Sequence, residues 1–204
     1  QPLKIYILKN GKWLFLLACS FALVPFLHAQ RVKLIEGDLS PLKSEKSIVL
    51  AFSYDNMQVG KFDRDEDYIN SRKEELNKKE AGRGDTWAKS WVADRNARYE
   101  PKFTELFQKY SVLAPGPNAK YTLLFKTTFT EPGFNVGVMK KNALINGEAW
   151  IVETANKDHV IAKISVTKSP GRSFWGADYD TGVRIEEAYA MAGKAVGRFL
   201  KDKL

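Results

Sequence analysis

The chain has 204 residues, of which 44% are hydrophobic and 27% charged, and its formal net charge at pH 7 is +8. One cysteine and two histidines exclude intramolecular disulfides and leave a thiolate zinc site without enough ligands. A chain of this length and composition can bury a core that needs no covalent cross-links.

The first 29 residues have the pattern of a secretory signal peptide. Three lysines lie within the first 12 residues, an apolar run of 15 residues follows at 13–27, and a small residue stands at Ala29. The run is short for a membrane span, which needs about 20 residues. We therefore expect residues 1–29 to be removed by cleavage after Ala29 and the protein to be periplasmic or secreted. An uncleaved membrane anchor is the alternative.

Cys19 offers a second processing route, because Leu16-Leu-Ala-Cys19 has the form of a lipoprotein signal in which Cys19 would be lipidated. Two features argue against this route. Only six apolar residues separate Lys12 from Cys19, fewer than the usual run of about 7–15, and the stretch after Cys19 stays apolar where a tether would be polar. A membrane-tethered lipoprotein remains the alternative localisation.

Cleavage would remove 29 of the 204 residues and leave 175, residues 30–204, which is the size of one domain. The formal charge would fall from +8 to +5, because the leader carries three lysines and no acidic residue. A moderate, dispersed positive charge allows weak association with anionic surfaces. It is not the footprint of a nucleic-acid-binding protein, and an exported protein has little access to nucleic acid.

The first half of the domain combines short strands with a long helical region. Residues 32–36 predict an edge strand, and the apolar run 47–54 predicts a strand covered on both faces. A helical insertion is expected at about 63–110. Its charged first helix spans 68–80, and Gly82-Arg-Gly84 breaks it.

Asp85 or Thr86 should cap the second helix of the insertion, on which Trp87 and Trp91 share a face. Pro101 suits the start of the third helix. That helix carries an apolar stripe expected to face the core, formed by Phe103, Leu106, Phe107 and Tyr110.

The second half changes to a period of two. Residues 121–130 alternate and predict a strand with four apolar side chains on one face, those of Tyr121, Leu123, Phe125 and Phe129. Residues 143–154 and 160–167 predict a hairpin. A last helix is expected at 181–201, and glycines within it predict a close approach to the sheet. The fold class is α/β (α+β): a single domain with a mixed four- or five-stranded sheet, helices packed on it, a parallel crossover between 47–54 and 121–130, and a long C-terminal helix.

Two acidic groups are candidate metal sites. The spacing of Asp63, Asp65 and Asp67 is similar to that of a calcium loop, but Tyr68 stands where such a loop needs glycine, so an acidic helix start is favoured. Asp178, Asp180 and Glu186 form the second group, weak candidates for a metal site or for hydrolytic carboxylates. The favoured alternative is that Asp180 or Thr181 caps the last helix.

No cofactor is expected. No glycine-rich phosphate loop precedes a helix, and no nucleophile motif is present. Of the two histidines, His28 lies in the leader and His159 stands alone at a turn, where it is expected to be a solvated surface residue.

Large rings in two glycine-containing loops are the candidate binding residues. Phe134 lies in the first loop, and Phe174, Trp175 and Tyr179 lie in the second, at 169–180. Aromatic side chains on loops can bind a partner, but they can also pack over the edge of a sheet.

Several segments resemble uncharacterised secreted envelope proteins of Bacteroides-type bacteria. The resemblance rests on the strand 121–129, the hairpin 143–167, Gly176-Ala-Asp-Tyr-Asp-Thr-Gly-Val-Arg-Ile-Glu-Glu-Ala-Tyr189, Ala192-Gly-Lys-Ala-Val-Gly-Arg-Phe199 and Gly82-Arg-Gly-Asp-Thr-Trp87. The layout is also similar to the N-terminal α/β domain of periplasmic TolB. The resemblance implies an envelope location and an accessory, non-enzymatic role, and it supplies no functional residues.

We therefore expect an exported accessory or binding protein of the cell envelope that contacts a protein or a glycan and does not catalyse a reaction. The alternative is a metal-dependent or carboxylate-based hydrolase of the periplasm, using Asp178, Asp180 and Glu186.

Overall fold

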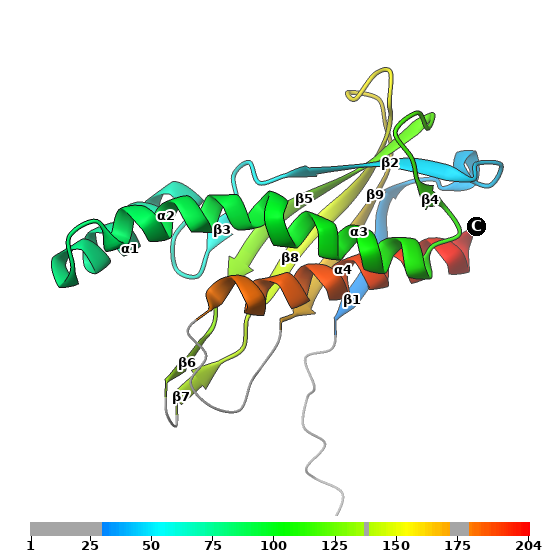
Figure 1. Ribbon diagram of the computed structural model, residues 1–204. Helices are drawn as coiled ribbons and strands as arrows, with labels where there is room; N and C mark the ends of the chain where they lie inside the picture. The colour runs from blue at the N-terminus through cyan, green and yellow to red at the C-terminus, as the bar shows by residue number, and fades with distance from the viewer. Residues whose placement is uncertain (1–29, 137–138, 172–179) are drawn as a thin grey trace, which may run out of the picture.

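One mixed sheet of seven strands forms a layer of the protein in the computed structural model, which describes residues 30–136, 139–171 and 180–204 (Figure 1). Five strands have seven or more residues. The strand order is β1 (Arg31–Gly37), β9 (Val160–Pro170), β8 (Leu144–Glu153), β5 (Tyr121–Glu131), β2 (Ser47–Ser53) and β4 (Ala114–Pro115), and β3 (Gln58–Val59) also pairs with β5.

The pairing combines both strand directions. β1, β9, β8 and β5 are antiparallel neighbours, whereas β2 is parallel to β5, with Val49 opposite Thr122 and Ser53 opposite Lys126. A helical crossover joins β2 to β5, as predicted from the length of chain between them. The α/β fold class with a mixed sheet, packed helices and a long C-terminal helix is thus confirmed.

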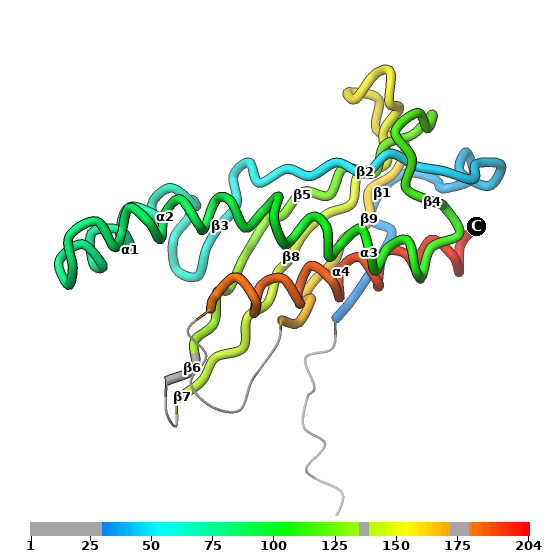
Figure 2. Tube along the Cα trace, viewed as in Figure 1, coloured from blue at the N-terminus to red at the C-terminus, as the bar shows by residue number. Residues whose placement is uncertain are grey.

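The α-helices in the described residues are α1 (Asp65–Lys79), α2 (Arg83–Asp94), α3 (Glu100–Tyr110) and α4 (Thr181–Lys203), and a π-helical turn at Arg95–Tyr99 joins α2 directly to α3. Of these, α3 and α4 lie on one face of the sheet (Figure 1). Figure 2 shows α1 and α2 extending beyond the sheet as a helical arm. None of the helices in the described residues is both long and apolar enough to cross a membrane.

Aromatic rings form the contact between the layers. Phe103 of α3 lies 4.7 Å from the ring of Phe125 on β5 and packs edge-on against Phe52 on β2. Tyr99 stacks on Tyr189 of α4 with ring centroids 4.9 Å apart. The helical arm has its own cluster, in which the ring of Tyr68 contacts those of Trp87 and Trp91.

Close packing of α3 on α4 corrects one prediction. The glycines of the last helix were expected to approach the sheet, but Gly193 faces the carbonyl oxygen of Phe103 and Gly197 that of Phe107, both on α3. A side chain at Gly193 would place its Cβ 2.2 Å from the Phe103 oxygen. The glycines therefore set the distance between two helices.

Two predictions about strands are wrong. β2 is not covered on both faces: from Val49 to Ser53 its residues are half-buried, because the helices cover one face only. Phe129 does not share the buried face of β5, because the register shifts between Thr127 and Phe129. This one-residue bulge leaves Thr127 buried on the helix side and places Phe129 opposite Asn146.

The predicted cap of the second helix is also wrong. α2 begins at Arg83, with Gly82 in the left-handed conformation at the N-cap and no side-chain cap. Asp85 instead pairs with Lys73 at 2.7 Å and so ties α2 to α1.

Candidate functional site

A groove with a volume of about 920 Å³ runs between β2 and α3. In Figure 1 the two elements lie side by side, with β4 beside one end. Its walls come from the second half of β2, from one side of α3 and from the segment after α3: Val49, Leu50, Ala51, Phe52, Asn96, Glu100, Pro101, Thr104, Glu105, Gln108, Pro115, Gly116 and Pro117.

The strand wall of the groove is an open sheet edge. β4 pairs with β2 at Ser47 and Ile48 only, where the carbonyls of Lys46 and Ile48 accept hydrogen bonds from Ala114 and Gly116. Backbone groups alternate in direction along a strand, so the N–H and C=O of Leu50 and Phe52 point to the same edge as those of Ile48. Beyond Ile48, no described strand pairs with that edge.

The helix wall is polar and acidic. Asn96, Glu100, Thr104 and Gln108 recur every fourth residue and so form one line along the helix surface. Glu105 adds a second carboxylate, held by Lys102 at 2.8 Å. No lysine or arginine is among the described residues that line the groove.

A polar cluster lies around Glu100, next to the π-helical turn. The hydroxyl of Tyr54 donates a hydrogen bond to Glu100 Oε1 at 3.4 Å, and the guanidinium of Arg95 lies 4.5 Å from the centre of the Tyr54 ring. Arg95 is also paired with the buried carboxylate of Asp65, which accepts a hydrogen bond from Trp91 Nε1 at 2.9 Å. π-Helical turns occur frequently at functional sites, and this one places Arg95 between the arm and the groove.

Burial governs the titration of this cluster. It raises the pKa of Tyr54 far above its ordinary value, so the phenol stays protonated and can donate. Burial also raises the pKa of Glu100, although the Tyr54 hydroxyl and the charge of Arg95 act in the opposite direction. The groove thus offers free backbone donors and acceptors along one wall and carboxylates along the other, which suits an extended polypeptide with basic side chains.

The aromatic residues predicted to bind a partner are not part of this groove. Phe134 begins β6 (Phe134–Val136), which forms a separate hairpin with β7 (Met139–Lys141), and its side chain is 43% exposed. Phe174, Trp175 and Tyr179 lie outside the described residues.

Asp180 and Glu186, the two described members of the second acidic group, have different surroundings. Asp180 caps α4, as predicted, by accepting a hydrogen bond from the Val183 N–H at 3.2 Å, and it pairs with Arg98 at 2.9 Å. Burial acts to raise the pKa of Asp180, but Arg98 and the helix N–H outweigh it and hold that pKa below its ordinary value. Glu186 is half-buried further along α4, and Asp178 lies outside the described residues.

The other candidates have structural partners. Asp65, from the first acidic group, is buried against Trp91 and Arg95, and Asp67 pairs with Arg64 at 3.2 Å. His159 is exposed beside Glu153, at 3.2 Å. Within the described ranges, no three His, Cys, Asp or Glu side chains are placed to hold a metal ion. Cys19 lies in the part of the chain that the structure does not describe.

Sequence reasoning missed the groove because an open edge depends on which strand is the neighbour. The one local signal was the polar spacing of four from Asn96 to Gln108, which runs beside the predicted apolar stripe, about a quarter turn round the helix from it.

Comparison with known proteins defines no family for this two-layer α/β chain. No protein-family model and no curated protein matches it. Among solved structures, it is similar to a PelC dodecamer from Paraburkholderia phytofirmans, with 11% identity, a TM-score of 0.39, and coverage of 83% of this chain and 98% of that one. A variant of the same PelC gives 11% identity, a TM-score of 0.35, and coverage of 80% and 96%. Likeness at this level carries no argument about function.

Proposed function

We propose that this chain is an exported, non-catalytic binding protein of the cell envelope that accepts an extended segment of a partner protein at the open edge of β2. The single observation that carries the proposal is the edge of β2 from Val49 to Ser53, which no described strand covers and which lies beside a groove of about 920 Å³. Export is supported by the signal-peptide pattern of residues 1–29.

Strand addition explains the composition of both walls. A partner strand would form main-chain hydrogen bonds with Leu50 and Phe52, and every second side chain would face the carboxylates of Glu100 and Glu105. Basic side chains at those positions would complement the acidic wall, so we propose an extended partner segment with alternating lysine or arginine.

The test uses a defined probe, an acetylated peptide of about six residues with alternating valine and lysine, which extends to about 20 Å. The critical variant is Leu50→Pro, which removes the N–H that points to the open edge but leaves the bonds from β2 to β5 in place. We expect the affinity for the peptide to fall at least about tenfold. Hydrogen exchange of the Leu50 and Phe52 amides in the natural chain should slow when the peptide binds.

Leu50→Ala is the matched control, because it shortens the same side chain and keeps the N–H. Thermal unfolding of both variants establishes that they are folded. Equal affinity of Leu50→Pro and Leu50→Ala for the peptide, or unchanged exchange at Leu50 and Phe52, would exclude strand addition at this edge.

A further inference from the structure

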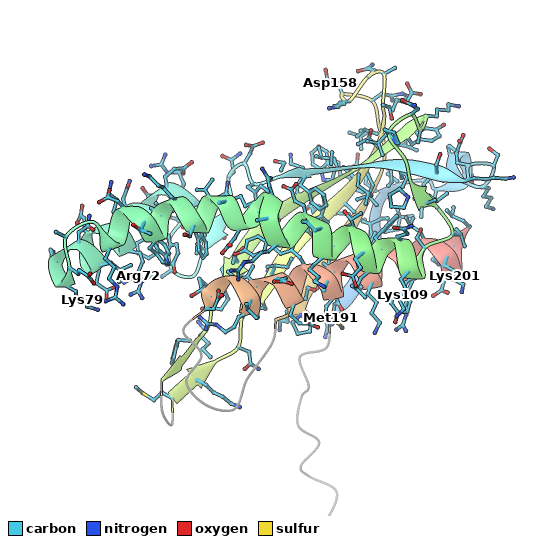
Figure 3. All side chains as sticks on the ribbon, in the orientation of Figure 1. Arg72, Lys79, Lys109, Asp158, Met191 and Lys201 are labelled. Atoms are coloured by element: carbon cyan, nitrogen blue, oxygen red, sulfur yellow. The ribbon has the colours of Figure 1, made fainter. Side chains whose placement is uncertain are left out.

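Basic side chains gather around two aromatic rings at the C-terminal ends of α3 and α4. The ring of Tyr110 has three cations around it, Lys109 at 5.8 Å, Lys194 at 5.1 Å and Arg198 at 4.7 Å. Lys203 lies 5.9 Å from the ring of Phe199. We call the surface formed by Lys109, Lys194 and Arg198 the basic end surface; Figure 3 labels Lys109 and Lys201 in this region.

Among the described residues, these cations and Lys203 have no carboxylate partner, in contrast to most cations of the helical arm. On the arm, Arg64, Arg72, Lys73, Lys79 and Arg83 each form an ion pair with a carboxylate. In the described part of the chain, no ion pair involves any member of the basic end surface. Asp202 is the only acidic residue among the last eleven, 194–204.

Helix capping explains only part of this surface. Cations in the last turn of a helix stabilise it through its dipole, which accounts for Lys109 at the end of α3 and for Lys203 at the end of α4. Arg198 lies more than one turn, and Lys194 more than two turns, before the end of α4. The effect of the helix dipole has faded at both positions. Their placement on one side of α4 with Tyr110 between them therefore needs another reason.

The position of Gln30, the residue after the signal-peptide pattern, bears on this reason. Gln30 donates hydrogen bonds to the Met191 carbonyl at 3.2 Å and to Ser169 Oγ at 3.1 Å. It lines a hollow of about 290 Å³ together with Lys194 and Arg198. The apolar run 13–27 and Cys19 precede Gln30 directly in the chain. If the alternative localisation holds and Cys19 is lipidated, the twelve residues from Cys19 to Gln30 span at most about 40 Å, so the lipid would hold this surface close to a membrane.

We infer that the basic end surface binds the anionic lipid headgroups of a membrane. Lysine and arginine close to an anionic bilayer are each attracted to it, and half-buried rings such as Tyr110 and Phe199 suit the boundary between headgroups and water. The inference is independent of the groove at β2 and shares with it only the envelope location.

The test measures partition of the full chain onto vesicles of phosphatidylcholine with about one third phosphatidylglycerol, and onto vesicles of phosphatidylcholine alone. The variant is Lys194→Glu with Arg198→Glu. Loss of each basic residue should weaken binding to the anionic vesicles about fivefold, so the double variant should lose at least about 25-fold. Partition onto neutral vesicles should not change, and high salt should remove the difference.

Lys78→Glu with Lys89→Glu is the matched control, because it makes the same change in net charge at two exposed lysines of the helical arm. Residues 1–29 are the same in all variants, so their contribution cancels. An equal loss in both double variants, an equal loss on neutral vesicles, or full binding by Lys194→Glu with Arg198→Glu would overturn the inference. The inference would also be overturned if soluble alginate, an anionic polysaccharide, bound through Lys194 and Arg198 while vesicles did not. If the glutamate pair fails to fold, Lys194→Gln with Arg198→Gln must show a loss in the same direction.

Discussion

Two stacked tyrosines in the core differ in how their hydroxyls are satisfied. The hydroxyl of Tyr189 is hydrogen-bonded to Thr127 Oγ1 at 2.7 Å, whereas the buried hydroxyl of Tyr99 has no hydrogen-bond partner among the described residues. An unsatisfied buried hydroxyl costs free energy, because it loses its bond to water and gains none in return. The Tyr99 ring thus stabilises the fold while its oxygen opposes it.

Tyr99→Phe should therefore raise the free energy of unfolding by about 1 kcal/mol, because the ring stack stays and the unsatisfied oxygen is removed. Urea unfolding followed by circular dichroism measures the change. Tyr189→Phe is the matched control and should destabilise by about 1 kcal/mol, since it leaves Thr127 without its partner. A Tyr99→Phe variant as destabilised as Tyr189→Phe would show that the Tyr99 hydroxyl is satisfied in solution.

Individual residues were predicted well where burial decided their role. Phe103 and Phe107 were expected to face the core and are fully buried. Asp180 was expected to cap the last helix and does so. The role of Asp65 could not be predicted, because its partners Trp91 and Arg95 lie 26 and 30 residues away and meet it only when the arm folds back.

At the level of elements, the contact of α3 with α4 depends on glycine. Gly193 and Gly197 are one helical turn apart, on the side of α4 that meets the backbone of α3. Glycine within a helix costs about 1 kcal/mol relative to alanine. The close contact of the two helices offsets this cost.

Gly193→Ala should lower the free energy of unfolding by about 2 kcal/mol or more, because its Cβ would lie 2.2 Å from the Phe103 oxygen and the helices would have to separate. Gly197→Ala is the control: its nearest contact would be 3.0 Å, so a smaller shift suffices. Denaturant titration of both variants measures which of them has the lower free energy of unfolding. If Gly193→Ala is the more stable of the two, helix propensity outweighs the contact.

Strand boundaries followed from the pattern of apolar residues, but the bulge in β5 did not. The alternation from Tyr121 to Phe125 fixes the buried face, and the same alternation continues in the sequence to Phe129. The extra residue between Thr127 and Phe129 reverses the faces, and no glycine or proline marks it. The position of β2 in the sheet could not be predicted either. Its apolar run is typical of a covered strand, yet no described strand pairs with its outer edge beyond Ile48.

For the whole molecule, the fold class was predictable because the elements alternate in type and length, whereas the groove arises only when β2 and α3 are brought together. This assembly also gives stability a dependence on pH. The pKa values of Glu100 and Asp94 are raised, mainly by burial, and that of Asp180 is lowered. The raised groups bind protons more readily in the folded state than in the unfolded chain.

Glu100→Gln should isolate one of these contributions. Between the ordinary value of 4.5 and its raised folded pKa, Glu100 holds more protons in the folded state, so stability falls as pH rises through this window. Glutamine can still accept the Tyr54 hydrogen bond and does not titrate. The free energy of unfolding of the variant, relative to the natural chain, should increase from about pH 4 towards pH 8. A difference that is constant over this range would show that burial does not raise the pKa of Glu100.

The pairing of β1 with β9 joins Arg31 to Thr167, across most of the described chain. Within the described residues, β9 is the only strand beside β1, so β1 cannot pair until a segment more than 120 residues later in the chain is available. Contacts this distant in sequence slow folding. Until β9 has been synthesised, residues 31–37 remain an unpaired extended segment, which a chaperone that recognises such segments could bind.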